Sequence, residues 1–296
     1  MSAVPGSGGD VQLDVTAGCA DVQDRLLLLD AVLPELCRLQ QRRLRAHVQP
    51  DPDGTLLRVR VTGRPGAVRP AAELLAATAR AQLGRRAGAQ VRIEPVDAAP
   101  PGPPSVRDQL LGSAVEALAE SVRALLGDGA SPGRVHLAMT ALAVAVLGHP
   151  LGVAAGHLPL RARVAAFSRE FDPAGELRSV CDRVWAARGG NVLQTVRQLA
   201  AGTSDPVGDP WRHWARGAWQ ICLADGPALA DDPALAEDPA LAEDPARPAL
   251  SALDVLAELL DVCGVSPVER YLAGHLVLAA TERLIGAPRP ERWTTA

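Results

Sequence analysis

Lysine is absent from this sequence, and aromatic residues are rare. All 30 basic residues of the 296-residue chain are arginine, and aromatic side chains make up only 3% of it. The arginine bias is typical of a GC-rich genome, so arginine at any one position says little about function. Aliphatic side chains must fill the core, since so few rings are available. The formal net charge of −4 is small for this length and indicates neither a nucleic-acid partner nor a membrane partner.

Recognisable cofactor motifs are also missing. The five cysteines are scattered, with no C-x-x-C pair and no Cys/His cluster, so neither a zinc site nor a disulfide framework is predicted. No Walker-type phosphate loop and no G-x-G-x-x-G turn occurs. We therefore expect no metal and no organic cofactor. The N-terminus lacks the pattern of a signal peptide, and the longest apolar stretch is too short to span a bilayer, which predicts a cytoplasmic protein.

The N-terminal part of the chain predicts a helix, a turn and a strand in succession. Leucine and valine recur at helical spacing through residues 24–47, and Pro34 inside this pattern predicts a kink or a break. The Asp-Pro-Asp-Gly run at 51–54 is a turn sequence. In the strand that follows, apolar residues alternate with Arg58 and Arg60, so one face is buried and the two arginines share the other. A solvated surface and a site for an anionic or peptide partner both explain that face.

Further segments extend this pattern to an α+β protein. Strands are predicted from residue 11 and at 90–96, with a second helix at 70–83 before the last strand, which gives the order βαβαβ. The Pro-rich run at 98–104 marks a boundary. Beyond it the sequence is helical, with segments expected at 105–126, 134–147, 162–171, 175–187, 191–201, 211–224, 251–263 and 267–284.

The predicted organisation is a flexible tail (1–9), a small ferredoxin-like antiparallel sheet region (10–97) and a larger helical region (105–296), with a peptide groove between the two regions. An acidic repeat interrupts the helical region. The hexapeptide PALADD from residue 227 is followed by two copies of PALAED. Because each copy begins with proline and offers little that can form a core, a disordered surface loop is predicted over 227–245.

The helical region contains two candidate groups of side chains. Trp211, His213 and Trp214 belong to the densest aromatic cluster of the chain, and the two tryptophans share a helical face because they are three residues apart. They either fill the core or form a wall on which flat rings stack. Tyr271, the only tyrosine, and His275 share a face at i, i+4 spacing. Tyr271 is either a proton donor or a buried side chain with a backbone partner.

Five short motifs follow one another in a characteristic order. They are DRLL from Asp24, PEL from Pro34, the strand LLRVR from Leu56, IEPV from Ile93, and GVSPVERYL from Gly264. In this order they resemble the thiopeptide-type bacteriocin biosynthesis family, which is related to the glutamate-elimination domain of lantibiotic dehydratases. The resemblance covers most of the chain.

The sequence departs from the elimination domains at two places. Their Glu and Arg after the third strand are replaced by Val96 and, approximately, Ala99. Their His and Asn before the final Leu-Gly are replaced by aliphatic residues near Leu256 and Leu260. The acid–base pair needed for β-elimination of activated glutamate is therefore missing. The resemblance then implies the branch of stand-alone pyridine synthases.

Members of that branch join two dehydroalanines of an azole-rich ribosomal peptide in a formal aza-[4+2] cycloaddition. Loss of water and of the leader peptide then gives a pyridine and a macrocycle. By this resemblance we expect a cofactor-independent cyclase or lyase whose partners are the precursor peptide, with its leader and core, and other enzymes of the pathway. A non-catalytic leader-binding scaffold subunit and a glutamate-elimination enzyme remain alternatives. The catalytic candidates are Arg58, Arg60, Tyr271 and His275, and the substrate-binding candidates are Trp211, His213 and Trp214.

Overall fold

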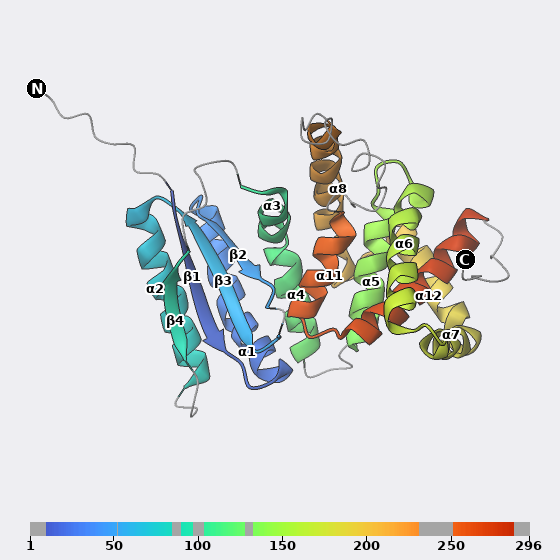
Figure 1. The fold of residues 1–296 in the computed structure, drawn as a ribbon, viewed down its shortest axis with the longest axis horizontal. Helices are drawn as coiled ribbons and strands as arrows, with labels where there is room; N and C mark the ends of the chain where they lie inside the picture. The colour runs from blue at the N-terminus through green and yellow to red at the C-terminus, as the bar shows by residue number, and fades with distance from the viewer. Residues whose placement is uncertain are drawn as a thin grey trace, which may run out of the picture. The chain divides into compact units, whose positions relative to one another are not determined.

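The chain is an α+β protein made of two compact units (Figure 1). The computed structural model describes residues 10–51, 53–84, 90–96, 104–127, 133–230 and 251–286, apart from the side chains of 225–230. The first unit extends to Gly129 and also contains Asp261–Gly264. The second contains Ala130–Leu260 and the chain from Val265 onwards. The predicted tail at 1–9 lies outside the described residues.

A four-stranded antiparallel sheet forms the centre of the first unit. Its strands are β1 (Val11–Gly18), β2 (Arg45–Gln49), β3 (Leu56–Gly63) and β4 (Val91–Pro95), in the spatial order β2-β3-β1-β4. Helix α1 (Val22–Gln41) connects β1 to β2, and α2 (Pro65–Leu83) connects β3 to β4. This βαββαβ order confirms the ferredoxin-like arrangement that the sequence predicts.

Helices α1 and α2 cover one face of the sheet (Figure 1). The apolar residues of the strands point to that face, where Val15, Val48 and Val59 are buried, as are Leu33 of α1 and Leu75 of α2. Side chains alternate between the two faces of a strand, so the opposite face carries the polar side chains of all four strands. That polar face includes Arg58 and Arg60.

The first helix is shorter than predicted, and an unpredicted strand follows it. α1 ends at Gln41 rather than at residue 47, and Arg43 has a left-handed conformation with φ of 63°, so the chain turns directly into β2. The prediction is wrong here because an arginine-rich segment, with no glycine or proline, separates the helix from the strand. Of the kink or break predicted at Pro34, the break is wrong, since α1 is continuous through this residue, and the kink stays a prediction.

Two further helices belong to the first unit. α3 (Val106–Ser113) packs on β2, and α4 (Val115–Leu126) packs on α1. A single helix was expected over 105–126, and the structure interrupts it at Ala114. The two helices follow the Pro-rich run at 98–104, yet they pack with the sheet.

The second unit is helical throughout its described part. Its helices are α5 (Arg134–Leu147), α6 (Val153–Phe171), α7 (Glu176–Ala200), α8 (Gly208–Ala230), α11 (Ala252–Val262) and α12 (Pro267–Ile285). α12 lies at the centre and packs against α5, α6 and α7. Residues 273–282 of α12 and residues 137–146 of α5 are all buried, so both helices are enclosed on every side. None of the helices in the described ranges is long and apolar enough to cross a membrane.

Several helices of this unit extend further than predicted. α7 is one helix of 25 residues, where a stop was expected at Gly189 and Gly190. A Cβ at Gly189 would lie 2.9 Å from the ring of Trp185, so this glycine makes room for the indole and does not end the helix. α6 begins earlier than predicted and contains Pro159. α8 reaches Ala230 within the first copy of the repeat, and the remainder of the predicted loop lies outside the described residues.

Candidate functional site

The polar face of the sheet carries side chains in rows that cross the strands. One row, called here the acidic row, contains His47, Arg60, Asp14 and Glu94. The next, called the basic row, contains Gln49, Arg58, Thr16 and Arg92. Directly opposed residues of neighbouring strands have Cβ atoms about 4.5–5.5 Å apart, so neighbours within a row are close enough to interact. Arg58 and Arg60 therefore occupy different electrostatic surroundings on one face.

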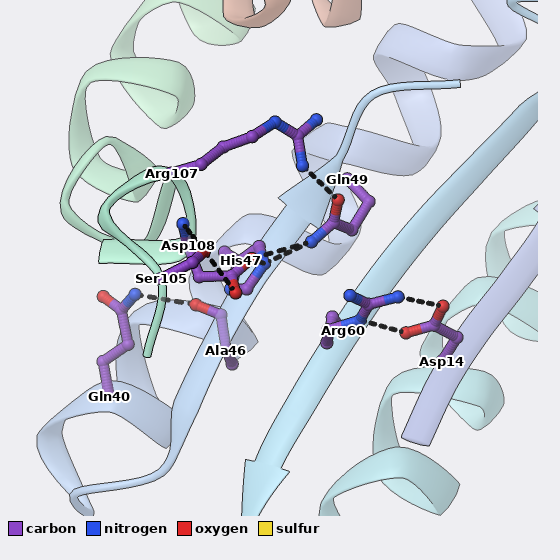
Figure 2. A network of polar contacts seen from close by, with 9 residues as sticks. All are labelled: Asp14, Gln40, Ala46, His47, Gln49, Arg60, Ser105, Arg107 and Asp108. Atoms are coloured by element: carbon purple, nitrogen blue, oxygen red, sulfur yellow. Dashed lines mark hydrogen bonds and ion pairs between the residues drawn. The ribbon is translucent and has the colours of Figure 1, made fainter. Parts of the chain in front are cut away.

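Arg60 is neutralised within the acidic row (Figure 2). Its Nε lies 2.9 Å from one carboxylate oxygen of Asp14, and its Nη2 lies 3.0 Å from the other. A bidentate ion pair of this kind fixes the orientation of the guanidinium and neutralises its charge. Asp14 is only 7% exposed, so water screens the pair little. The hydrogen bond with Asp14 raises the pKa of Arg60 above its ordinary value.

A polar network attaches α3 to the β2 edge of this face (Figure 2). His47 Nε2 lies 3.4 Å from Asp108 Oδ1 and 2.6 Å from the side-chain nitrogen of Gln49. Arg107 Nη1 donates to Gln49 Oε1 at 3.2 Å, and the hydroxyl of Ser105 donates to Asp108 Oδ2 at 2.8 Å. His47 and Gln49 are both buried. Both polar groups of the Gln49 amide are thus engaged.

Gln40 on α1 also contributes to the contact between β2 and α3. Its side-chain nitrogen donates to the carbonyl oxygen of Ala46 on β2 at 2.8 Å and to that of Gly112 on α3 at 2.7 Å (the Ala46 bond is drawn in Figure 2). One amide group therefore joins α1, β2 and α3. Buried carbonyl groups need such partners, because an unpaired one costs about 1–3 kcal/mol.

Asp108 is the charged centre of the network. Its hydrogen bond with His47 is the main cause that holds the pKa of its carboxyl well below the usual range. The hydrogen bond from Ser105 and the positive charge of Arg60 act in the same direction, while burial opposes them. Asp108 therefore stays a carboxylate at any working pH and balances positive charge at this edge of the sheet.

Replacing Asp108 by asparagine is expected to destabilise the protein by about 1–2 kcal/mol near neutral pH, because a charged acceptor is lost from a partly shielded site. A carboxyl with a depressed folded-state pKa contributes stability above its unfolded pKa, about 4, and loses it as the pH falls further. The difference between wild type and D108N in unfolding free energy should therefore shrink as the pH falls below about 4. Urea unfolding at several pH values measures this, and a difference that persists unchanged in acid would contradict it.

Arg58 is less completely paired than Arg60. Its Nε atom is buried and has no hydrogen-bond partner among the residues that the structure describes. Gln49, directly opposite on β2, is already engaged by Arg107 and His47. A buried N–H without an acceptor costs about 1–3 kcal/mol, so Arg58 is less well satisfied in its position than Arg60.

Tyr271 and His275 form a second group, on α12 in the second unit. The Tyr271 ring stacks on Phe167 of α6, with centroids 4.8 Å apart and planes inclined by 23°. His275 Nε2 lies 3.2 Å from Asp182 Oδ1 on α7, and its ring centroid is 6.4 Å from that of Tyr271. Tyr271 is 4% exposed, whereas the side chain of Asp182 is 51% exposed. The His275–Asp182 pair thus lies partly at the surface of this unit, whereas Tyr271 is buried beside it.

The surroundings of Tyr271 keep its hydroxyl protonated. Burial raises its pKa above the ordinary value, and a hydrogen bond with Ser168 opposes this shift. Burial also raises the pKa of Cys181 to about 11, so this nearby thiol is neutral at physiological pH and is not an activated nucleophile. Asp182 orients the His275 ring, as carboxylates do for histidines that transfer protons. The Tyr271 hydroxyl and the His275 ring are thus each held by a neighbouring side chain, and their role in catalysis stays a prediction.

The tryptophan cluster lies in the core of the second unit. Trp211 is 0% exposed and Trp214 is 3% exposed, and their rings meet edge to face with centroids 5.5 Å apart. His213, between them in sequence, is exposed on α8. Trp219 donates from Nε1 to the carbonyl oxygen of Ala145 at 2.8 Å, which joins α8 to α5. These contacts support the core, and a role of the cluster in substrate binding stays a prediction.

The predicted site residues are divided between the units: Arg58 and Arg60 belong to the first, the remaining candidates to the second. The groove expected between the two regions stays a prediction. Sequence reasoning missed the partners that orient these residues, namely Asp14, His47, Gln49, Arg107, Asp108, Ser168 and Asp182. Across the described ranges, no group of three or more His, Cys, Asp and Glu side chains is arranged to hold a metal ion.

Comparison with known proteins identifies solved structures that have this fold. The chain is similar to the pyridine synthase TbtD from thiomuracin biosynthesis, with a TM-score of 0.66 and 19% identity over 95% of this chain and 100% of that one. It is also similar to TsrL, with a TM-score of 0.56 and 17% identity over 96% of this chain and 100% of that one. No protein-family model and no curated protein matches the sequence. The shared fold therefore extends over the whole of both neighbours.

Proposed function

We propose that this protein is a pyridine-forming macrocyclase of thiopeptide biosynthesis that acts on a ribosomally made precursor peptide. The observation that carries the proposal is the likeness in fold to the pyridine synthase TbtD over nearly the entire chain. The order of motifs from DRLL to GVSPVERYL supports the same class. Both observations concern most of the chain, so neither rests on a single residue.

The proposed reaction joins two dehydroalanines of one peptide. The iminol form of the amide before one dehydroalanine supplies a 2-azadiene, the second dehydroalanine supplies an alkene, and two carbon–carbon bonds close the ring. Loss of water removes the oxygen of that amide. A second elimination breaks the bond between carbon and the leader nitrogen, so the leader departs as a carboxamide. The products are a pyridine macrocycle, water and the leader, with no oxidant or reductant needed.

The demands of this reaction agree with the residues present. Holding the two ends of one peptide together is worth up to about 7–11 kcal/mol as effective molarity, so positioning dominates. Tyr271 is assigned as a proton donor that favours the iminol and assists loss of water. His275, oriented by Asp182, takes and returns protons during the two eliminations. Arg58 is assigned to substrate binding, and Arg60, fixed by Asp14, positions the polar face.

Mass spectrometry of the products tests the proposal against its alternatives. Incubation with a dehydroalanine-containing precursor should release water and the leader peptide and leave a shorter macrocycle. A scaffold subunit would leave every mass unchanged. An enzyme that eliminates glutamate would release glutamate from glutamylated serine, and either of these two results would reject the cyclase.

A further inference from the structure

The two rows on the polar face of the sheet have opposite charge balance. In the acidic row Arg60 faces two carboxylates, Asp14 and Glu94. In the basic row Arg58 and Arg92 flank Thr16, and the row contains no carboxylate. Both oxygens of Asp14 are bonded to Arg60, so the acidic row does not compensate Arg58. A positive charge excess therefore remains on one row.

The neighbours of Arg58 also leave it short of an acceptor. Its Nε is buried and unpaired among the described residues, and the Gln49 carbonyl oxygen opposite accepts from Arg107. At the β2 end of the row, the Arg107 guanidinium and the Asp108 carboxylate both contact Gln49, so the uncompensated charge of the row is that of Arg58 and Arg92. Arg58 is half-buried and Arg92 is exposed, so a ligand can reach the row from solvent on this unit. The site thus offers positive charge and the accessible part of the Arg58 guanidinium, while its Nε stays covered.

We propose that the basic row binds a carboxylate, the side chain of an Asp or Glu in the bound peptide, and that Arg58 rather than Arg60 is its principal contact. A carboxylate has two oxygens that match a guanidinium fork, and its charge balances the row. A neutral peptide carbonyl could accept a hydrogen bond from the guanidinium but would leave the excess charge. The proposal rests on the proposed function only in taking the ligand to be a peptide.

Fluorescence anisotropy with two labelled peptides tests the inference. One is the protein's own precursor peptide, and the other is the same peptide with every Asp and Glu replaced by Asn and Gln. Wild type should bind the acidic peptide about tenfold more tightly or better, as expected for a charge-assisted pair that is partly shielded. R58Q should remove most of that preference, and R92Q should remove part of it.

A control variant separates the site from a general charge effect. R69Q removes one positive charge from an exposed position on α2 of the same unit, where Arg69 pairs with Glu73, and should keep the preference. Circular dichroism and thermal midpoints check that each variant is folded. The comparison of R58Q with R69Q decides the matter.

Three results would overturn the inference: equal affinity of wild type for the two peptides, full preference in R58Q, or an equal loss in R69Q. Turnover of the dehydroalanine substrate, measured on the same proteins, separates this outcome from that of the proposed function. A preference lost in R58Q without any turnover by wild type would retain the carboxylate site and reject the cyclase. Turnover by wild type with no preference would retain the cyclase and reject the site.

Discussion

Replacing His275 by glutamine is expected to lower substrate turnover by about 10²–10⁴-fold, the range that a general acid–base group contributes. Glutamine keeps a polar side chain of similar reach beside Asp182 but cannot carry a proton between groups near neutral pH. D182N should have a smaller effect, about tenfold, because the carboxylate acts only by orienting the His275 ring. Single-turnover kinetics followed by mass spectrometry measures both.

Two further variants define how that result is interpreted. Y271F keeps the ring that stacks on Phe167 and removes only the hydroxyl, so a loss of rate with unchanged stability would assign the proton donor. H136Q changes an exposed histidine of α5 in the same unit and should leave the rate unchanged. Near wild-type turnover by H275Q would remove the α12 group from the proposed site.

Replacing Trp211 by alanine is expected to destabilise the protein by about 3–5 kcal/mol, the usual cost of truncating a buried aromatic residue. Trp211 is fully buried and meets Trp214 edge to face, so its removal leaves a cavity and an unsupported ring. H213A on the exposed side of the same helix should change stability by less than about 0.5 kcal/mol. Denaturant unfolding, followed by near-ultraviolet circular dichroism of the tryptophans, measures the difference.

A variant of Trp214 tests the predicted role of the tryptophans in substrate binding. If they form a stacking surface, a milder change such as W214F should weaken peptide binding more than it reduces stability. If they only support the core, binding by the folded fraction should stay the same. A W211A protein as stable as wild type would contradict the placement of this residue in the core.

The elements whose hydrophobic pattern is regular are the ones that the sequence predicts correctly. Strand β3 alternates cleanly, and α5 and α12 are close to the segments expected at 134–147 and 267–284. Strand β2 was missed because it is short and because Arg43 turns the chain at a positive φ without glycine. Its buried pair Ala46 and Val48 is too brief a pattern to outweigh the helical pattern that precedes it.

Glycine and proline misled the prediction because they were taken to end helices. Gly189 resembles a helix stop, yet its missing side chain makes room for the ring of Trp185, four residues earlier in the same helix. Pro34 and Pro159 lie inside continuous helices, where each costs a hydrogen bond but does not end the helix.

The candidate site shows a similar division. Spacing within one element predicts that Arg58 and Arg60 share a face of a strand. It likewise predicts that Tyr271 and His275 share a face of a helix. Spacing does not predict that Arg60 is more completely paired than Arg58, because the pairing depends on Asp14, which is 46 residues away from Arg60 in sequence. Likewise, the partner of His275 is Asp182, 93 residues away. Only the strand register and the helix packing bring these side chains together.

The central claim, that the protein forms a pyridine, is tested most directly by labelling one oxygen. The precursor carries ¹⁸O in the carbonyl of the amide that precedes the azadiene-forming dehydroalanine. It is incubated with the protein, and the macrocycle, the leader and the water are analysed. The account predicts an unlabelled macrocycle, an unlabelled leader carboxamide in equal amount, and the label in the released water. Retention of ¹⁸O in a product of unchanged mass, or release of glutamate with the label still in the peptide, would contradict it.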